Sequence, residues 1–426
     1  MPMVLKSFDM EKQVLIIGGG IVGLSTAYYL TKAGHAVTVL DKGEINKGAS
    51  FVNAGYLTPS HIMPLAAPGM VSKGLKMMFN SASPFYMKPR WDMEFFKWAW
   101  YFYRSCTPGN VKKAIPAIKE INLLSRTLYE EIHRSNDLGP FHLDRKGLLM
   151  LYQTQASLEH EKEVAAKASQ LGLEVDYLNQ AQLKQMEPEV EVNALGAIHY
   201  ECDGHMTPTE FMPKMVHFLK SKGVALHTRE TVLELRTKNQ RISQVISNKN
   251  TYQPDEVVLA AGTWSATLAR QIGVPLSLQG GKGYRIDVKR STGIHMPAIL
   301  MESNMAVTPM KGFTRFAGTM EFSGNNDIVR RERALALVQG AKKYYPQLHI
   351  GPEEIAAAQT GLRPVSPDGL PYVGRCGAYD NVLFATGHAM MGWSLGPATG
   401  KLIEELISGK QTSMPLDMFR PDRKFK

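Results

Sequence analysis

A short apolar run near the start of the chain leads through a cluster of glycines into a second apolar pattern with a different period. Residues 14–17 are apolar at every position, which is typical of a strand buried on both faces of a parallel sheet. The next segment has helical spacing and stops at Gly34; its apolar face consists of Leu24, Ala27 and Leu30. A second apolar strand follows at residues 37–40. The pattern predicts a strand, a helix and a parallel strand.

The middle of the chain departs from this pattern and then returns to it. Residues from about 70 to 200 are predicted to be mostly helical, with an amphipathic helix at 157–172. A helix at 207–223 is then followed by a strand at 224–228 and a buried strand at 257–261 that runs into Gly262 and a further helix near Trp264. These last segments are expected to rejoin the first sheet.

Polar and apolar positions alternate over much of residues 276–350. This alternation favours an antiparallel sheet, with strands at 284–290, 305–310 and 314–322 followed by a helix. The chain closes with a buried strand at 382–386 and a helix that ends at Gly409; its apolar stripe contains Leu395, Leu402, Ile403 and Leu406.

These elements predict an α/β fold with two domains threaded through each other. A Rossmann-like nucleotide-binding domain is assembled from residues 1–68, 205–275 and 357–426. Residues 69–204 and 276–356 form an α+β substrate domain with a mostly antiparallel sheet.

The glycines after the first strand follow the spacing Gly-x-Gly-x-x-Gly, at Gly18, Gly20 and Gly23. The first permits a tight turn, the second lets the backbone approach a pyrophosphate, and the third lets the helix pack closely on the strand. Asp41 ends the second strand, where a carboxylate binds a ribose hydroxyl and repels a 2′-phosphate. The motif indicates an ADP-containing dinucleotide, NAD or FAD, and disfavours NADP.

The composition and charge of the chain limit the classes of ligand and partner that we expect. The chain has 426 residues, 44% of them apolar and 21% charged, as in an ordinary globular protein. A net charge of +10 suits anionic cofactors, acidic substrates or an anionic membrane surface. No basic run is interleaved with aromatics, so nucleic acid is not expected. Three scattered cysteines predict a reducing compartment and neither a disulfide framework nor a metal cluster; they are Cys106, Cys202 and Cys376.

The sequence predicts a cytoplasmic protein. Residues 1–12 lack the pattern of a secretory signal, and no run of 18 apolar residues is present. Residues 95–104 hold seven aromatic side chains together with Lys97 and Arg104. This segment fits a buried helix of the second domain, which is the favoured interpretation, or an amphipathic element at the inner face of the cell membrane.

The closing segment favours flavin over nicotinamide. Gly387, Gly392 and Gly396 permit close approach to a helix N-terminus, whose partial positive charge stabilises the negative charge of a reduced flavin. A nicotinamide does not need this feature.

Several motifs resemble the D-amino acid oxidase superfamily, nearest its bacterial D-amino acid dehydrogenase branch and then glycine oxidase. The C-terminal signature lies at 359–375 and 381–409, and further similar motifs lie at 15–43, 50–59, 257–265 and 282–288. The resemblance implies noncovalent FAD with its isoalloxazine between the two domains. It also implies that the family's cofactor-binding positions correspond to Gly18, Gly20, Ile21, Val22, Gly23, Asp41, Lys42, Ser50, Asn53, Ala54, Gly55, Val232, Ala261, Gly262, Gly387, His388, Met391, Gly392, Trp393, Ser394 and Leu395.

Arg363 matches the arginine that binds the substrate carboxylate in glycine oxidase relatives, and a guanidinium offers a carboxylate two parallel donors. Tyr284 is a second candidate for the substrate pocket. Two departures from the family stand out: Asp41 replaces a frequent glutamate, and no cysteine precedes the Pro-Asp step where sarcosine oxidase relatives attach their flavin.

The function implied by the resemblance is dehydrogenation of a D-amino acid, with D-proline or hydroxy-D-proline as candidates. Hydride passes from Cα to flavin N5, water hydrolyses the imine, and a quinone or other carrier accepts the electrons. Because orientation suffices, His61, His205 and His388 are not assigned as bases. The alternatives are a glycine or sarcosine-type oxidase that produces hydrogen peroxide, and a noncatalytic flavoprotein subunit that relays electrons.

Overall fold

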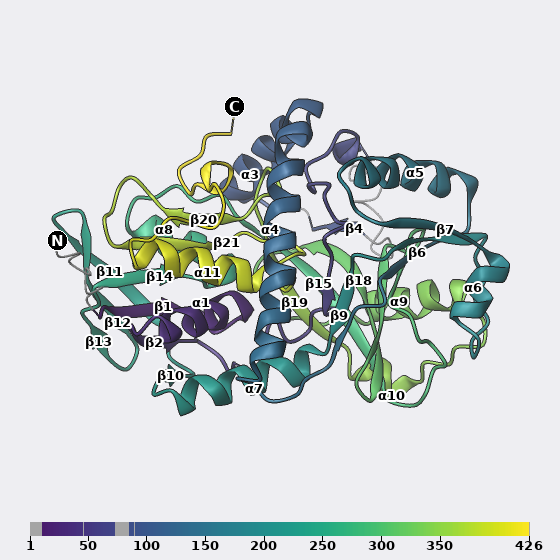
Figure 1. Ribbon diagram of the computed structural model, residues 1–426. Coiled ribbons are helices and arrows are strands. Elements are labelled where there is room, and N and C mark those ends of the chain that lie inside the picture. The colour runs from purple at the N-terminus through teal and green to yellow at the C-terminus, as the bar shows by residue number, and fades with distance from the viewer. Residues whose placement is uncertain (1–10, 46, 73–84, 89, 426) are drawn as a thin grey trace, which may run out of the picture.

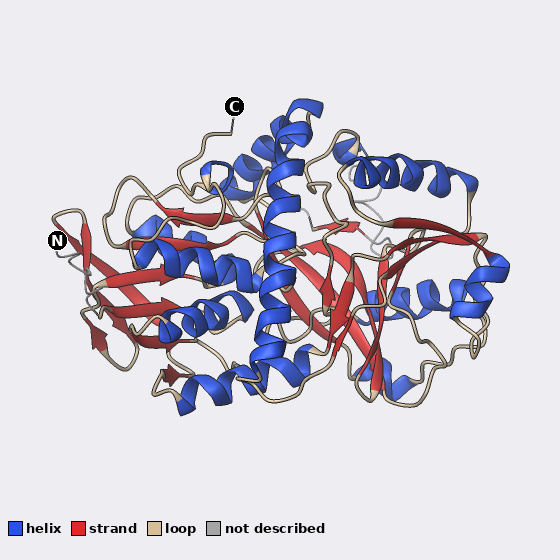
Figure 2. Ribbon diagram, in the orientation of Figure 1, coloured by secondary structure: helices blue, strands red, loops and turns tan. Residues whose placement is uncertain are grey.

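The computed structural model describes residues 11–45, 47–72, 85–88 and 90–425. Two sheets lie side by side, and the long helix α4 (Pro108–Ser135) runs between them (Figure 1). In Figure 2 the six-stranded sheet occupies the left half of the molecule and the nine-stranded sheet the right half. This arrangement agrees with the predicted α/β architecture of two sheet domains.

The six-stranded sheet is assembled from segments far apart in the chain. Its order is β10 (Ala225–His227), β2 (Ala36–Leu40), β1 (Gln13–Ile17), β14 (Glu256–Leu259), β21 (Val382–Thr386) and β20 (Tyr372–Arg375). All neighbours are parallel except β20, which is antiparallel to β21. The predicted return of the later strands to the first sheet is confirmed, although the strand expected at 257–261 already ends at Leu259.

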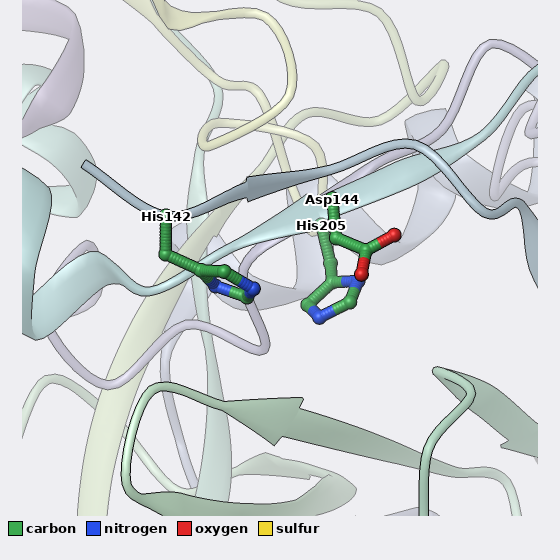
Figure 3. Close-up of side chains that lie close together, drawn as sticks. All are labelled: His142, Asp144 and His205. Carbon is green, nitrogen blue, oxygen red and sulfur yellow. The ribbon is translucent and has the colours of Figure 1, made fainter. Parts of the chain in front are cut away.

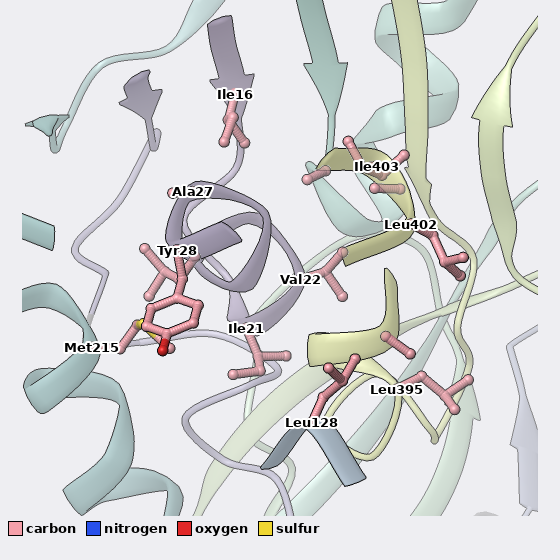
Figure 4. Close-up of a cluster of buried hydrophobic side chains, with 14 of the residues drawn as sticks. Ile16, Ile21, Val22, Ala27, Tyr28, Leu128, Met215, Leu395, Leu402 and Ile403 are labelled. Atoms are coloured by element: carbon pink, nitrogen blue, oxygen red, sulfur yellow. The ribbon is translucent and has the colours of Figure 1, made fainter. Parts of the chain in front are cut away.

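Helices α1 (Ile21–Lys32) and α11 (Gly396–Ile407) pack against each other on this sheet (Figure 4). A Cβ atom added at Gly400 would lie 2.5 Å from the carbonyl carbon of Ser25, so the two backbones approach closely only because residue 400 is a glycine. Val22, Leu402 and Ile403 fill the contact. The packing fixes the N-termini of both helices at the same edge of the sheet.

The second sheet is mostly antiparallel, as predicted. Its order is β19 (Gln359–Val365), β15 (Gln279–Val288), β18 (Phe313–Phe322), β17 (Met305–Met310), β16 (Ala298–Leu300), β6 (Leu148–Tyr152), β8 (Gly196–Tyr200) and β7 (Val175–Asn179), and β4 (Phe85–Met87) pairs with β18. Only the β16–β6 and β18–β4 pairs are parallel.

The predicted mostly helical character of residues 70–200 is wrong in part, because β6, β7 and β8 supply one end of this sheet. Residues 359–365 form β19, which pairs with β15 in the second sheet. The predicted division of the chain into two domains at residue 357 stays a prediction.

The remaining elements flank these sheets. The helices are α3 (Met93–Ser105), α5 (Gln155–Gln170), α6 (Gln180–Met186), α7 (Pro208–Ser221), α8 (Ser265–Gln271), α9 (Arg331–Tyr344) and α10 (Pro352–Ala356), with short turns η1 (Gly262–Trp264) and η2 (Asp417–Phe419). Two small sheets are formed by β11 (Val232–Lys238), β12 (Arg241–Ser247) and β13 (Thr251–Tyr252), and by β3 (Tyr56–Leu57), β9 (Gly204–Met206) and β5 (Leu143–Asp144).

The aromatic segment forms helix α3, whose N-terminus is capped by the Asp92 side chain. One face, with Phe95 and Trp98, is buried, whereas Trp100 on the opposite face is 55% exposed. The expectation of a buried helix therefore holds for one face only. Among the described residues, no helix combines the length and the apolar character needed to cross a membrane. The predicted absence of a signal in residues 1–12 concerns a segment that lies mostly outside the described residues.

Candidate active site

A cavity of about 1700 Å³ lies between the two large sheets. Ordinary small-molecule pockets measure roughly 300–1,000 Å³, so this cavity has room for a dinucleotide together with a substrate. The structure brings most of the predicted site residues to its wall; these are Gly18, Gly20, Ile21, Val22, Asp41, Lys42, Ser50, Asn53, Ala54, Val232, Ala261, Gly262, Tyr284, Arg363, His388, Met391, Gly392, Trp393 and Ser394.

Four predicted cofactor residues do not line the cavity: Gly23, Gly55, Gly387 and Leu395. Gly23 serves helix packing instead, since a Cβ atom there would lie 1.9 Å from the Gly18 carbonyl oxygen. Gly55 has a φ of +79° and leaves no room for a Cβ atom beside the Met206 carbonyl oxygen. These glycines shape the backbone behind the wall of the cavity.

The turn between β1 and α1 is built for a close approach of backbone to ligand. Gly18 has a φ of +119°, and a Cβ atom there would lie 2.3 Å from the Ala260 carbonyl oxygen. The Asp41 carboxylate accepts hydrogen bonds from the amides of Gly19 (2.7 Å) and Gly43 (2.8 Å). These bonds fix an acceptor at the carboxyl end of β2, and a carboxylate has further lone pairs for a ribose hydroxyl.

Two other predicted residues support this turn. The Ser50 hydroxyl accepts a hydrogen bond of 2.9 Å from the Ile21 amide in the first turn of α1. The Lys42 ammonium lies 3.1 Å from the centre of the Trp264 ring, a cation–π contact. Helix α1 thus presents its N-terminus and a nearby cation to the cavity, as binding of a pyrophosphate requires.

The segment between β21 and α11 forms the wall where the flavin is predicted. Trp393 is buried, and its indole N–H lacks a hydrogen-bond partner among the described residues. The Ser394 hydroxyl donates to Asn122 Oδ1 (2.9 Å) and accepts from the Thr58 amide (3.1 Å). The loop is therefore held by its neighbours, and it includes a buried indole N–H without a described hydrogen-bond acceptor. These features fit the ring system of a bound flavin.

Histidines near the cavity are neutral and structural in character. His388 Nε2 lies 2.9 Å from the Thr399 hydroxyl of α11, and burial lowers the pKa of His388 to about 3. Burial also lowers the pKa of His61 on the cavity wall to about 4. His205 does not line the cavity. Imidazoles with such low pKa values are poor proton acceptors at neutral pH.

Arg363 extends from β19 into the cavity and lies over the backbone of β15. A Cβ atom added at Gly283 would lie 2.4 Å from the guanidinium, so glycine is needed there. The guanidinium donates to the Thr319 carbonyl oxygen (2.6 Å), and no described carboxylate forms an ion pair with it. Burial lowers the pKa of Arg363 to about 10. A partly buried cation that lines a cavity and lacks a described anionic partner is suited to bind an anion.

Thr319, which the sequence analysis did not single out, shapes the same site. It has a φ of +64°, uncommon for a β-branched residue, at an irregularity in the pairing of β15 with β18. Thr319 lines the cavity, and its buried hydroxyl lacks a hydrogen-bond partner among the described residues. Glycines inside a strand, such as Gly283, signal close backbone approach, but no sequence pattern marks the conformation of Thr319.

Tyr284 lines the cavity with its ring, whereas its hydroxyl turns away into a buried ionic cluster. The hydroxyl donates to Glu321 Oε2 (2.8 Å), and Glu321 also pairs with Lys282 (3.2 Å) and Arg333 (3.8 Å). Burial raises the pKa of Tyr284. The predicted role of Tyr284 in the substrate pocket stays a prediction, restricted by this hydrogen bond to contacts of the ring.

None of the described residues that line the cavity is a cysteine. Cys376 is buried among apolar side chains.

Comparisons with known proteins show relatives that match almost the whole chain. The D-amino acid dehydrogenase of Neisseria gonorrhoeae is 29% identical over 412 residues, which cover 95% of this chain and 97% of the relative. Glycine oxidase from Geobacillus kaustophilus has a similar structure, with a TM-score of 0.77 at 22% identity over 97% of this chain and 99% of its own. The structure of L-proline dehydrogenase from P. horikoshii is also similar, with a TM-score of 0.73 at 18% identity over 96% of this chain and 97% of its own.

These structural neighbours have the same fold. The model of the DAO family, described as FAD-dependent oxidoreductase, matches residues 13–406 and so includes both the turn after β1 and the segment before α11. The protein belongs to the DAO family of FAD-dependent oxidoreductases.

Proposed function

We propose that this FAD-dependent oxidoreductase dehydrogenates free D-amino acids and binds the substrate carboxylate on Arg363. The observation that carries the proposal is the partly buried guanidinium of Arg363, which lines the cavity and donates to the Thr319 carbonyl oxygen and weakly to the Met320 thioether, with no described carboxylate as its partner. A carboxylate supplies the missing negative charge and accepts two parallel hydrogen bonds. The name of the Neisseria relative, D-amino acid dehydrogenase, supports both the reaction and the substrate's chirality.

The residues of this chain orient the substrate and keep water from it. Arg363 fixes one end of the amino acid, and the backbone of the neighbouring Thr319 holds its guanidinium in place. When bound, FAD takes up the hydrogen and the electron pair that leave the substrate Cα. The described histidines on the wall have low pKa values and the Tyr284 hydroxyl is engaged with Glu321, so the substrate ammonium gives its proton to water before the hydride leaves Cα, and positioning supplies most of the catalysis.

D-Proline and hydroxy-D-proline are the substrates we favour within this class. Their oxidation gives a cyclic imine that stays closed, so the site needs no residue to protonate a leaving group. The thioether of Met320 lies 3.9 Å from the Arg363 guanidinium, which places an apolar contact beside the carboxylate site. A small ring without charge suits these surroundings.

A membrane quinone is the electron acceptor we propose, because helix α3 joins the cavity to an exposed apolar surface. Phe95 and Trp98 line the cavity, and the Trp98 indole donates to the Val365 carbonyl oxygen two residues from Arg363 (2.9 Å). The other face and the residues before it expose large apolar side chains; these are Trp91, Met93, Phe96, Trp100 and Tyr103. Lys97 and Arg104 flank them, as in helices that rest on anionic lipid.

Steady-state turnover tests the reaction and the acceptor. The FAD-loaded protein is assayed with D- and L-proline, D- and L-alanine, glycine and sarcosine, first with a soluble quinone and then with oxygen alone. We expect turnover of D-enantiomers with the quinone and little oxygen uptake. Preference for glycine or sarcosine with stoichiometric hydrogen peroxide would identify an oxidase instead. No turnover of any amino acid would support an electron-relay subunit.

Sedimentation with lipid vesicles tests the proposed membrane surface. Vesicles containing phosphatidylserine are expected to bind the protein, and the double substitution Phe96→Ser and Trp100→Ser should weaken binding at least tenfold. Tyr177→Ser removes a similarly exposed aromatic residue from β7 and serves as the control. Equal binding by all three proteins would exclude α3 as the membrane contact.

A further inference from the structure

Three potential metal ligands meet on the small sheet formed by β3, β9 and β5. His142 directly precedes β5, Asp144 ends it, and His205 lies in β9. Strand periodicity places residues 142 and 144 on one face, and the antiparallel register sets Asp144 opposite His205. Figure 3 shows the His142 ring directed toward His205, with the Asp144 carboxylate beside the His205 ring. One ligand atom from each residue lies within 4.8 Å of those from the other two.

His205 presents a lone pair to this cluster. Its Nε2 lies 2.8 Å from the Pro309 carbonyl oxygen, which only accepts hydrogen bonds, so Nε2 carries the proton and Nδ1 is unprotonated. Nδ1 is buried and lacks a hydrogen-bond partner among the described residues, while the whole residue is 1% exposed. A buried acceptor that is left unpaired costs free energy unless something binds to it.

His142 is oriented in the same way by a neighbouring side chain. Its Nδ1 lies 3.0 Å from the Thr207 hydroxyl, which also accepts a hydrogen bond from the Lys311 amide (3.0 Å). This contact leaves Nε2 of His142 available.

We propose that His142, Asp144 and His205 bind one divalent transition-metal ion of the zinc type. Two imidazole nitrogens and one carboxylate suit Zn²⁺, whereas Mg²⁺ and Ca²⁺ prefer oxygen ligands throughout. Ligands around a tetrahedral Zn²⁺ lie about 3.4 Å apart. Because His142 and Asp144 are only partly buried, small side-chain rotations can close the cluster to that spacing.

The groups around the cluster resemble the supporting partners of metal sites. The Pro309 carbonyl and the Thr207 hydroxyl hold the ring nitrogens that face away from the ion, as such partners commonly do. The Lys146 ammonium lies 3.5 Å from one Asp144 oxygen. Because the Lys146 side chain is largely exposed, it can move away and leave that oxygen to the metal ion. Three protein ligands leave a fourth position for water.

An ion at this place would join β5 to β9 beside the cofactor cavity. The amide of Met206, next to His205, donates to the Gly55 carbonyl oxygen (2.8 Å), and Asn53 and Ala54 of the same loop line the cavity. Metal binding therefore stiffens a loop that contacts the cofactor. A raised melting temperature is expected from it.

A second group of potential ligands supplies the control. Asp176, His199 and Glu201 also lie close together, but His199 Nε2 is bonded to the Lys146 carbonyl oxygen (2.8 Å) and both acids are exposed. This group offers one imidazole rather than two. We therefore expect His199→Ala to leave metal binding unchanged.

Metal titration of the FAD-loaded protein tests the proposal. After treatment with chelator, Zn²⁺ or Co²⁺ alone is added, and bound metal is measured together with the visible absorption of Co²⁺ and the melting temperature. We expect one ion per chain, with affinity reduced at least tenfold by His142→Ala and by Asp144→Asn but not by His199→Ala. Because His142 is half-buried, its replacement is not expected to prevent folding. The absence of stoichiometric binding, or equal binding by all variants, would overturn the assignment.

Discussion

Replacing Arg363 by methionine separates binding of the substrate from binding of the cofactor. Methionine keeps a long side chain above Gly283 but removes the charge and every donor. A carboxylate on Arg363 would accept two charge-assisted hydrogen bonds, each contributing about 1.5–3 kcal/mol. Their loss amounts to about 3–6 kcal/mol, or two to four orders of magnitude in kcat/KM. The flavin should remain bound, because Arg363 is predicted to contact the substrate alone.

The same substitution should not destabilise the protein. Arg363 is a partly buried cation without a described ion-pair partner, and desolvation already lowers its pKa to about 10. Methionine removes the cost of burying that charge and leaves one carbonyl oxygen of Thr319 without its donor, a loss of about 1 kcal/mol. We expect an unchanged or raised melting temperature together with a collapse of activity.

The assay compares kcat/KM for a D-amino acid, flavin content and melting temperature in wild type and Arg363→Met. Arg423→Met is the matched control, because Arg423 is paired with Asp368 (2.7 Å) and does not line the cavity. The control should lose stability and keep its kinetics. A decrease in kcat/KM below threefold, or loss of flavin and stability in Arg363→Met, would refute the reasoning.

Three further substitutions test residues that line the cavity or pack behind its wall. Gly283→Ala places a Cβ atom 2.4 Å from the Arg363 guanidinium, so kcat/KM should fall at least tenfold with flavin retained, as measured by turnover and absorption. Gly23→Ala places a Cβ atom 1.9 Å from the Gly18 carbonyl oxygen, so soluble flavin-loaded protein should be lost, as measured by its yield. The buried Asp203 carboxyl accepts hydrogen bonds from the Ser60 amide (2.9 Å) and the Ser60 hydroxyl (2.5 Å). Burial raises the pKa of Asp203 to about 7, so this group's contribution to stability is lost as pH rises from about 4 to about 7. Asp203→Asn should remove that decrease in melting temperature.

Controls for these variants are available in the same chain. Gly109→Ala meets only one side-chain atom, at 4.0 Å, and should behave as wild type. Wild-type kinetics in Gly283→Ala would show that the guanidinium lies elsewhere in solution. Normal yields of Gly23→Ala would contradict the close packing of α1 on the first turn. If the melting temperatures of Asp203→Asn and wild type depend on pH in the same way between pH 5 and pH 8, the Asp203 carboxyl does not titrate in that range.

The sequence predicted the cofactor half of the molecule because its signals are local. The glycine spacing at Gly18, Gly20 and Gly23 and the helix ending at Gly409 depend on neighbours a few residues away, and the structure has those elements where they were expected. Residues 148–152 and 196–200 were missed as strands. They are short apolar runs whose periodicity does not distinguish a buried strand from part of a buried helix.

The part of the site that is proposed to bind the substrate depends on contacts between distant segments, so it was harder to predict from the sequence. Arg363 could be selected from its motif, but its position over Gly283 and its bond to Thr319 arise only when β19, β15 and β18 pair. His142 and His205 likewise carry no spacing signal, since 62 residues of chain separate them and only the pairing of β5 with β9 brings them together.

The measurement closest to the central claim is the anaerobic visible spectrum of the flavin-loaded protein before and after addition of substrate. D-Proline and D-alanine are compared with their L-enantiomers and with pyrrolidine and ethylamine, which lack the carboxylate. We predict that the oxidised-flavin band disappears with a D-amino acid and persists with the L-enantiomers and the simple amines. Equal reduction by the amines would contradict recognition of the carboxylate by Arg363, and no reduction by any amino acid would contradict the proposed reaction.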